Sequence, residues 1–255
     1  MTSIIRQEDR AHDTRRGFLR AASAFAATVL APGVTLYAFG EKPASAGLAG
    51  GTASASKRWG MLIDAGKCGD RCDACVSACK EENGWGQSED PRTGAQWIRK
   101  VSIRDPKTGW SAEPPVMCQH CADPPCAEVC PTGASFKRAD GIVLVDKHIC
   151  IGCRYCMMAC PYKARSFVHE PIDDQKPNAP RGKGVVESCN LCVDRVDAGR
   201  KPACVEACSA KAGGAMTFGD LNDPASDITK AVKAKASAAI RGDLGLDPGV
   251  RYQNL

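Results

Sequence analysis

The hydrophobic positions along the chain fall into short runs separated by polar and glycine-containing segments. Two apolar runs, residues 61–64 and 142–145, have the length of β-strands. The turn sequence at residues 139–141 joins the second run to residues 134–137, which predicts an antiparallel hairpin. Residues 170–184 contain three prolines and show no periodicity, so we predict a surface loop there. The pattern therefore predicts a fold with little regular structure.

One stretch near the C-terminus has the period of an amphipathic helix. The residues expected on its apolar face are Ile228, Val232, Ala236 and Ile240. Asp223 is the expected N-cap, with Pro224 at the first helical position, and the helix is expected to end at Gly242. Residues 243–255 are expected to be extended and to lie either on this protein or on a partner.

The first 46 residues have the pattern of an export signal rather than of a folded element. A twin-arginine motif at residues 14–20 precedes an uncharged, alanine-rich stretch at residues 21–39. Residues 44–46, Ala-Ser-Ala, form a small-x-small site, and we expect cleavage after Ala46. The alternative is a retained membrane anchor, although the many small and polar residues make insertion unfavourable. We therefore expect export to the periplasm by the twin-arginine route.

Composition narrows the class of protein. In 255 residues there are sixteen cysteines but only fourteen aromatic residues, and hydrophobic residues make up 44%. Aromatic side chains normally fill much of a core, so we expect a group bound to the thiols to replace part of it. The net charge of +5 is too small to indicate nucleic-acid binding, and no glycine pattern typical of nucleotide phosphates occurs.

The cysteines form four groups of four, and none is left over. In chain order, groups one to four are Cys68, Cys72, Cys75 and Cys79; Cys118, Cys121, Cys126 and Cys130; Cys150, Cys153, Cys156 and Cys160; and Cys189, Cys192, Cys204 and Cys208. Disulfides would suit an exported protein, and zinc also binds pairs of cysteines. Neither explains three closely spaced cysteines in group three or Pro161 directly after its fourth.

Iron-sulfur clusters explain both features. Bacterial ferredoxins use the run Cys-x2-Cys-x2-Cys-x3-Cys-Pro, in which three thiolates hold one 4Fe-4S cluster and the fourth binds a second cluster. Twin-arginine export agrees with this interpretation, because that route carries proteins already folded around their cofactors. We therefore predict four 4Fe-4S clusters, with zinc and disulfides as the alternatives.

The chain also contains an internal repeat. Residues 63–68 match residues 145–150, with an aspartate four positions before the first cysteine of each group, and residues 126–134 match residues 204–212. Groups one and three are therefore equivalent, as are groups two and four. We predict an α+β fold of two pseudo-symmetric, bacterial ferredoxin-like units, each with short β-hairpins and helices around two 4Fe-4S clusters. The expected divisions are a signal peptide at 1–46, a four-cluster domain at 47–222, and a C-terminal helix and tail at 223–255.

Residues 145–162, together with residues 118–121 and 124–126, resemble the four-cluster iron-sulfur subunits of complex iron-sulfur molybdoenzymes and their relatives. The resemblance covers all of the chain after the leader. With the leader and residues 241–245, the chain looks closest to DsrO-type proteins, the periplasmic iron-sulfur subunits of the DsrMKJOP membrane complex of dissimilatory sulfur metabolism.

The resemblance implies that groups two and three exchange their fourth cysteines, as do groups one and four. The implied iron-ligand sets are set 1, Cys68, Cys72, Cys75 and Cys208; set 2, Cys79, Cys189, Cys192 and Cys204; set 3, Cys118, Cys121, Cys126 and Cys160; and set 4, Cys130, Cys150, Cys153 and Cys156. One departure from the family is the spacing in group one, where three residues, 69–71, separate the first two cysteines and relatives usually have two.

The resemblance further implies an electron-transfer subunit of an oxidoreductase complex, without a substrate site of its own. No nucleophile-base or paired-carboxylate arrangement stands out in the sequence. The implied partners are an integral membrane, quinone-interacting subunit of the polysulfide-reductase type, a periplasmic multihaem cytochrome c and other subunits of a DsrMKJOP-like complex. The alternatives are the iron-sulfur subunit of a periplasmic tetrathionate, thiosulfate or polysulfide reductase, and a structural zinc or disulfide protein.

Several side chains lie close to the cysteines in the sequence. Arg154, Lys163 and Arg165 would favour reduced clusters by Coulomb attraction, or they are solvated surface charges. His120 is a candidate donor to a cluster sulfur or to a partner, whereas we expect the backbone to satisfy His148. The tryptophans, which we expect to pack rather than to relay electrons, are Trp59, Trp85, Trp97 and Trp110.

Overall fold

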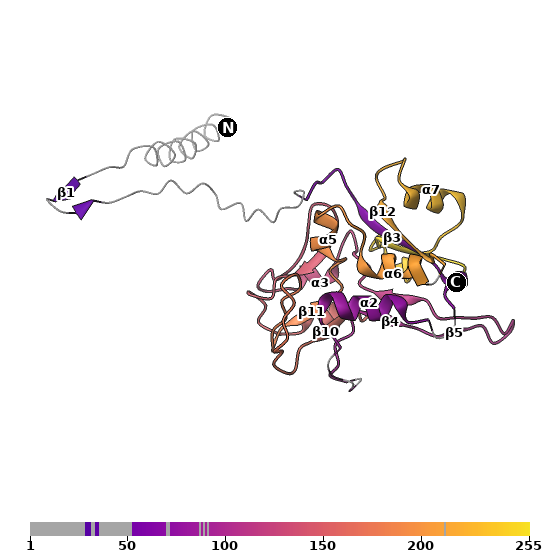
Figure 1. Cartoon of the computed structure of the whole chain (residues 1–255), viewed down its shortest axis with the longest axis horizontal. Helices are drawn as coiled ribbons and strands as arrows, with labels where there is room; N and C mark the ends of the chain where they lie inside the picture. Colours follow the sequence, from indigo (N-terminus) through magenta and orange to yellow (C-terminus); the bar gives the residue numbers. More distant parts are fainter. Residues whose placement is uncertain are drawn as a thin grey trace, which may run out of the picture. The chain divides into compact units, whose positions relative to one another are not determined.

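Figure 1 shows the computed structural model, which describes residues 53–69, 72–86, 88, 90, 92–211 and 213–255, and the backbone of two earlier strands. These strands, β1 (Val29–Ala31) and β2 (Val34–Thr35), pair antiparallel. The chain divides into two units, Met1–Leu48 and Ala49–Leu255. The twin-arginine motif and the expected cleavage site lie outside the described residues. Where the chain is described, no helix has the length and apolar character needed to cross a membrane.

The second unit contains short helices and strands joined by irregular segments. Its strands are β3 (Trp59–Asp64), β4 (Ile98–Lys100), β5 (Ile103–Arg104), β6 (Ser111–Ala112), β7 (Pro115–Met117), β8 (Ser135–Lys137), β9 (Val143–Val145), β10 (Arg165–Phe167), β11 (Val186–Ser188), β12 (Met216–Asp220) and β13 (Val250–Gln253). Its helices are η1 (Ala65–Lys67), α2 (Ala74–Asn83), α3 (Pro125–Glu128), α4 (Tyr155–Ala159), α5 (Val193–Asp197), α6 (Ala203–Lys211), α7 (Asp227–Ala234) and η2 (Gly242–Leu244). This mixture of helices and strands confirms the α+β class.

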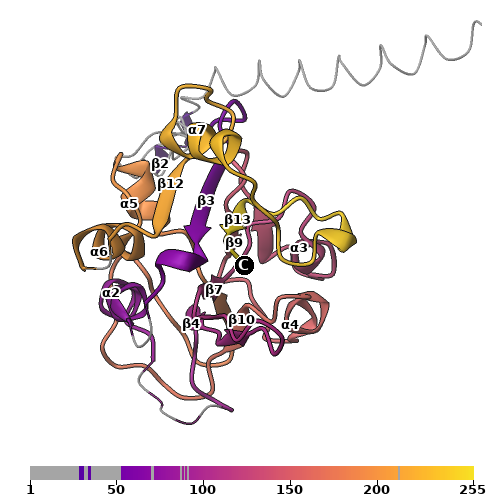
Figure 2. The ribbon, with the colours of Figure 1, turned by 90° about the vertical axis from the view of Figure 1, so that its right-hand side faces the viewer.

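The predicted strand at residues 61–64 is the centre of a three-stranded sheet. In the order β12-β3-β13, β12 runs antiparallel to β3 and β13 runs parallel to it. Ile63 is opposite Met216 on one side and Tyr252 on the other, and all three side chains are buried. Because β13 belongs to the C-terminal tail, the tail lies on this protein, beside β3 (Figure 2).

The internal repeat is visible in the strand pairing. β8 follows cysteine group two and pairs antiparallel with β9, which precedes group three, so the predicted hairpin is confirmed. In the same way, β12 follows group four and pairs with β3, which precedes group one. The pair β4 and β7 connects groups one and two, and the pair β10 and β11 connects groups three and four. Residues 168–185, between β10 and β11, contain the predicted irregular loop.

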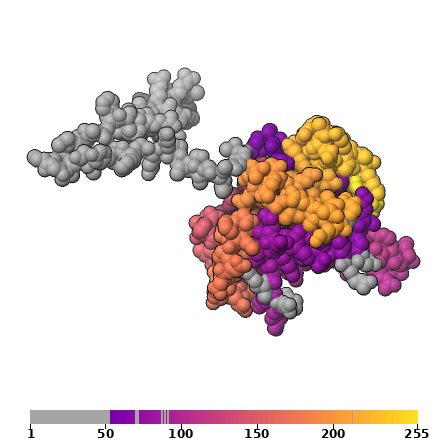
Figure 3. All heavy atoms as spheres, viewed as in Figure 1, coloured from indigo at the N-terminus to yellow at the C-terminus, as the bar shows by residue number. Residues whose placement is uncertain are grey.

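Short helices carry the cysteines, as predicted. α2 contains Cys75 and Cys79, and α6 contains Cys204 and Cys208. α2 packs against α6, and α3 packs against α4. On the face shown in Figure 3, the indigo surface of α2 and the orange surface of α6 are adjacent, so segments far apart in the sequence form one helix pair.

The C-terminal helix α7 is shorter than predicted. Ser226, not Asp223, is its N-cap: the Ser226 hydroxyl accepts a hydrogen bond from a backbone N–H of the first turn, whereas Asp223 lies in the preceding turn. The prediction that the helix ends at Gly242 is wrong, because Ala238 pairs with Tyr252 of the tail. Pairing with the tail therefore replaces the last turns of the predicted helix.

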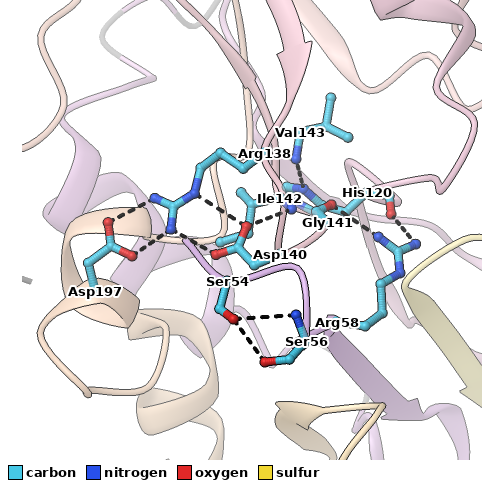
Figure 4. A network of polar contacts seen from close by, with 10 residues as sticks. All are labelled: Ser54, Ser56, Arg58, His120, Arg138, Asp140, Gly141, Ile142, Val143 and Asp197. Atoms are coloured by element: carbon cyan, nitrogen blue, oxygen red, sulfur yellow. Dashed lines mark hydrogen bonds and ion pairs between the residues drawn. The ribbon is translucent and has the colours of Figure 1, made fainter. Parts of the chain in front are cut away.

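Arg58 connects segments that are distant in the sequence. Its Nη1 donates to the carbonyl oxygen of Gly141 (3.1 Å), and its Nη2 donates to that of His120 (2.9 Å), as Figure 4 shows. Nη2 also donates to the carbonyl oxygen of Asp247 in the tail (3.1 Å). Gly141 has a φ of 87°, which favours glycine, and a Cβ there would lie 2.2 Å from Arg58 Nη1 and displace the guanidinium. This contact fixes the group two loop, the β8–β9 turn and the tail against one another.

Candidate metal centre

All sixteen cysteines lie within the described residues, and all have free thiols. The structure therefore gives the disulfide alternative no support. Many of the cysteines are buried, and they belong to both clusters of buried hydrophobic side chains that form the core. The thiols therefore occupy space that aromatic and aliphatic side chains fill in most proteins of this size.

Set 1 surrounds a small cavity, which Lys100 also lines. The cysteines in the lining are Cys68, Cys72, Cys75 and Cys208. The ammonium of Lys100 donates to the carbonyl oxygens of Cys72 (2.9 Å) and Gly69 (3.4 Å). Lys100 thus binds Gly69 and Cys72, and the unusual spacing does not prevent Cys68 and Cys72 from facing the same cavity.

Sets 3 and 4 surround two further small cavities. Around the first are Cys118, Cys121, Cys126 and Cys160, and around the second are Cys130, Cys150, Cys153 and Cys156. In each cavity, three cysteines come from one group and the fourth from the other. Groups two and three therefore exchange their fourth cysteines in space, as the resemblance implies.

Set 2 lies around the amide of Asn83, whose Nδ2 is 3.6 Å from Cys79 Sγ and 4.0 Å from Cys192 Sγ. Burial, and then the charges of Cys79, Cys204, Cys118 and Cys192, raise the pKa of Cys189 well above its usual value. Cys189 is therefore within electrostatic reach of the other three thiols of set 2 and of set 3. The structure therefore brings together the four cysteines of each predicted set.

Neighbouring sets are also within electrostatic reach of one another. Burial is the main reason for the raised pKa of three thiols, and a thiol of the next set contributes to each shift. The pairs are Cys204 with Cys75, Cys189 with Cys118, and Cys156 with Cys126. These pairs form a series in which set 1 is within electrostatic reach of set 2, set 2 of set 3, and set 3 of set 4.

Backbone geometry in the cysteine loops directs N–H groups towards sulfur. Gly152 adopts a φ of 68° between Cys150 and Cys153, which bends the loop tightly. The backbone N–H of Val186 donates to Cys150 Sγ (3.5 Å), and that of Ser135 donates to Cys130 Sγ (3.4 Å). Both donors belong to β-strands, so the hairpins help to position set 4.

Gly152→Ala is expected to destabilise the protein by about 1–3 kcal/mol, because the new Cβ would be strained at positive φ. It would also lie 2.1 Å from the carbonyl oxygen of Gly184. Gly199→Ala is the matched control, since Gly199 has a φ of 73° and open space around it. Anaerobic thermal unfolding of both variants measures the difference. Equal midpoints would show that the contact between Gly152 and Gly184 has no role.

Two side chains at the end of α2 and just after it, Asn83 and Trp85, point their N–H groups at sulfurs of set 2. Trp85 packs in the core, as predicted, and its Nε1 also donates to Cys79 Sγ (3.2 Å). Asn83 Nδ2 lies 3.6 Å from the same sulfur and 4.0 Å from Cys192 Sγ. Hydrogen bonds to sulfur stabilise the reduced form of an iron-sulfur centre. Asn83 was not predicted, although its place one helical turn after Cys79 is a usable sequence signal.

The cations near the cysteines divide into two kinds. Lys163 and Arg154 are exposed, and Arg154 covers the ring of Phe167, as the surface-charge alternative predicts. Arg165 is buried instead, with 6% of its surface exposed, and its Nη2 donates to Cys126 Sγ (3.0 Å).

The histidines and aspartates beside the loops have distinct roles. The Nδ1 of His120 accepts a hydrogen bond from the N–H of Val143 (3.0 Å; Figure 4), so the proton of the neutral ring lies on Nε2. Burial, and then the charges of two arginines, lower the pKa of His120 to about 3. Asp64 and Asp146 each accept a hydrogen bond from the N–H two residues later, 3.1 and 2.9 Å away, in equivalent turns before groups one and three. This shared turn explains the repeated aspartate.

Burial also governs the ionisation of the free thiols. It raises the pKa of Cys75 and Cys121 to about 11, and that of Cys79 and Cys118 to about 12. These thiols are therefore protonated at neutral pH. Because the thiolate is the metal ligand, binding must displace their protons.

The cavities fit iron-sulfur clusters. Arg165 Nη1 in the cavity of set 3 and Ser135 Oγ in that of set 4 are buried without a hydrogen-bond partner among the described residues. Cluster sulfurs accept hydrogen bonds from such donors. In the described part of the chain, no three His, Cys, Asp or Glu side chains converge on a single-ion site. Four thiols around a cavity match a polynuclear centre better than one zinc ion at about 2.3 Å from each sulfur.

Comparisons with known proteins agree with this site. Residues 110–221 match the model of the 4Fe-4S dicluster domain. The chain is 41% identical to Hdr-like menaquinol oxidoreductase iron-sulfur subunit 1 of Archaeoglobus fulgidus over 226 residues, which cover 78% of this chain and 84% of that protein. It is 38% identical to a subunit of the sulfite dehydrogenase of Allochromatium vinosum (75% and 81% covered) and 36% identical to a subunit of the tetrathionate reductase of Salmonella typhimurium (78% and 73% covered). The chain therefore belongs to the family of ferredoxin-like iron-sulfur subunits that serve Hdr-like, dimethyl sulfoxide reductase and tetrathionate reductase complexes.

Proposed function

We propose that this chain is an electron-transfer subunit that carries four 4Fe-4S clusters, one in each of sets 1 to 4, and has no substrate site of its own. The observation that carries the proposal is that four cysteines from two sequence groups surround each of three cavities, those of sets 1, 3 and 4. All sixteen cysteines are used as iron ligands in this arrangement. When bound, such clusters supply one-electron redox centres in which every iron is capped by cysteine.

The protein positions and insulates the series of four sets. All four cysteines of set 3 are buried, which keeps water from the middle of the path. At one end Cys153 of set 4 is exposed, and at the other Cys68 and Cys72 of set 1 are half-buried. Accessible ends and a buried middle suit a path between two different partners.

The repeat supports a fold of two ferredoxin-like units. The strand after one cysteine group pairs with the strand before its partner group, once as β8 with β9 and once as β12 with β3. In this proposal one unit holds sets 3 and 4, and the other holds sets 1 and 2. In each unit, the fourth ligand of a cluster comes from a different cysteine group than the other three. A bound cluster therefore links two segments of the chain, so cluster binding and folding are coupled.

The proposed partners follow from the relatives and the leader. One relative is by name a subunit of a menaquinol oxidoreductase, which supports a quinone-interacting membrane subunit of the polysulfide-reductase type as one partner. We propose a periplasmic multihaem cytochrome c and the other subunits of a DsrMKJOP-like complex as the remaining partners, with this chain in the place of DsrO. The twin-arginine motif supports a periplasmic location at the inner membrane, with cleavage after Ala46.

A second candidate is the iron-sulfur subunit of a periplasmic molybdoenzyme that reduces tetrathionate, thiosulfate or polysulfide. The identity of 36% to the tetrathionate reductase subunit supports it. The two candidates share the same electron-transfer chemistry and differ in the redox partner.

The test is to purify the membrane complex anaerobically through a tag on this chain and to add a menaquinol analogue. We expect electron paramagnetic resonance (EPR) signals of reduced clusters and covalently bound haem in the complex. Molybdopterin in place of haem would favour the second candidate. Clusters that neither the quinol nor the co-purified subunits can reduce or oxidise would contradict both.

A further inference from the structure

Arg165 lies at the first position of β10, where sets 3 and 4 meet. Its side chain lines the cavity of set 3, and its Nη2 donates to Cys126 Sγ at 3.0 Å. Its positive charge also acts on Cys118 of set 3 and on Cys156 of set 4. The guanidinium is therefore in direct contact with one set and within electrostatic reach of the next.

The burial of this cation without a carboxylate partner is unusual among the described residues. Three other arginines, Arg138, Arg181 and Arg195, are also well buried, and each contacts a carboxylate at 2.7–2.9 Å. Arg165 forms no carboxylate ion pair within the described ranges, and its Nη1 has no hydrogen-bond partner there. A buried charge without a counter-charge is costly. The thiolates of set 3 and the group they hold are therefore its natural counter-charge.

Set 2 has a different environment. Its side-chain donors, Trp85 and Asn83, are neutral. Set 4 receives backbone N–H groups from Ser135 and Val186, and its Cys153 is exposed. The cation that lines the set 4 cavity, Arg154, is exposed to water, and the cation near set 2, Arg195, is paired with Glu82. Water screens charges at an exposed site far more than at a buried one. Along the series, set 3 is thus the site whose four cysteines are all buried and which a buried cation, unpaired among the described residues, contacts.

We propose that Arg165 raises the reduction potential of the set 3 centre above those of its neighbours in sets 2 and 4. This inference rests on the proposed function. Each reduction adds one negative charge to the bound group, and the nearby guanidinium favours the more negative form. Set 3 would therefore accept an electron before either neighbour and hold it in the middle of the path.

The experiment is an EPR-monitored redox titration of the full-length holoprotein, with the set 3 signal identified as the one lost in Cys118→Ser. Arg165→Gln removes the charge but keeps a polar side chain, and we expect a lower midpoint potential for the set 3 signal. Arg165→Lys keeps the charge and should retain most of the potential. Lys163→Gln is the control, because this exposed charge lies two residues away, and it should leave all potentials unchanged.

Four signals and full iron content in Arg165→Gln, with an unchanged set 3 potential, would overturn the inference and leave the proposed function intact. Absence of four signals in the unmodified protein would instead contradict the proposed function. If Arg165→Gln does not assemble, the order of reduction in the unmodified protein decides. Signals lost in Cys189→Ser and Cys153→Ser identify sets 2 and 4, and reduction of either before set 3 would overturn the inference.

Discussion

Cys160→Ser should abolish the same EPR signal as Cys118→Ser, although Cys160 belongs to cysteine group three in the sequence. The reason is that Cys160 lines the cavity of set 3 with three cysteines of group two. A serine hydroxyl is a poor ligand for iron, so one of four clusters should be lost or converted to a form with fewer irons. Iron analysis should show a decrease of up to about four irons per chain, and EPR of the reduced protein identifies which signal disappears.

The matched variant is Cys130→Ser. Cys130 lies in group two in the sequence but lines the cavity of set 4 with Cys150, Cys153 and Cys156. It should therefore remove the signal that Cys150→Ser removes, and leave the signal of set 3. If Cys160→Ser and Cys150→Ser remove the same signal, each group binds its own cluster and the exchange of fourth ligands is wrong.

Glu187→Ala should destabilise the protein by about 3–5 kcal/mol, the usual cost of leaving a buried charge without its partner. Glu187 is completely buried in β11 and accepts two hydrogen bonds of 2.8 Å from the guanidinium of Arg181. Arg181 also donates to the carbonyl oxygen of Gly84, so the pair anchors the irregular 168–185 segment to the end of α2. Anaerobic urea unfolding, followed by far-UV circular dichroism, measures the loss.

Two controls separate the ion pair from general disruption. Arg181→Met combined with Glu187→Leu removes both charges and should recover a large part of the lost stability. Asp90→Ala removes a carboxylate from an exposed pair with Arg92 and should leave the midpoint unchanged. A Glu187→Ala midpoint equal to that of Asp90→Ala would show that the buried pair does not stabilise the fold.

Local sequence signals predicted the parts of the fold that depend on neighbouring residues. The turn at residues 139–141 and the apolar run after it were sufficient for the β8–β9 hairpin, since both strands lie within a few residues of each other. The repeated aspartate marked the internal repeat, and the structure shows that Asp64 and Asp146 each form an Asx turn, which needs only the next two residues. Three prolines likewise marked the loop between β10 and β11.

Features that depend on residues far apart in the sequence could not be predicted from local sequence signals. The end of α7 is set by pairing between Ala238 and Tyr252, and the tail finds its place by parallel pairing of β13 with β3, nearly the whole unit away. No local pattern specifies such a register. The burial of Arg165 similarly results from β10 pairing with β11 across the loop, whereas Lys163, of the same charge, remains exposed.

The sequence predicted more of the candidate metal centre than of the fold. Cysteine spacing identified the chemistry, and the family resemblance supplied the sets that the structure brings together. The donors were harder to predict, because tryptophan and asparagine are common core and helix-end residues. The spacing of Asn83 from Cys79 by one helical turn was available in the sequence, but only the structure shows that its amide faces sulfur.

The most direct test of the account is the iron, acid-labile sulfide and zinc content of the anaerobically purified full-length protein. Four bound clusters predict about sixteen irons and about sixteen sulfides per chain, with no zinc. Colourless protein with stoichiometric zinc and no sulfide, or correctly matured protein whose cysteines are joined in disulfides, would contradict the central claim.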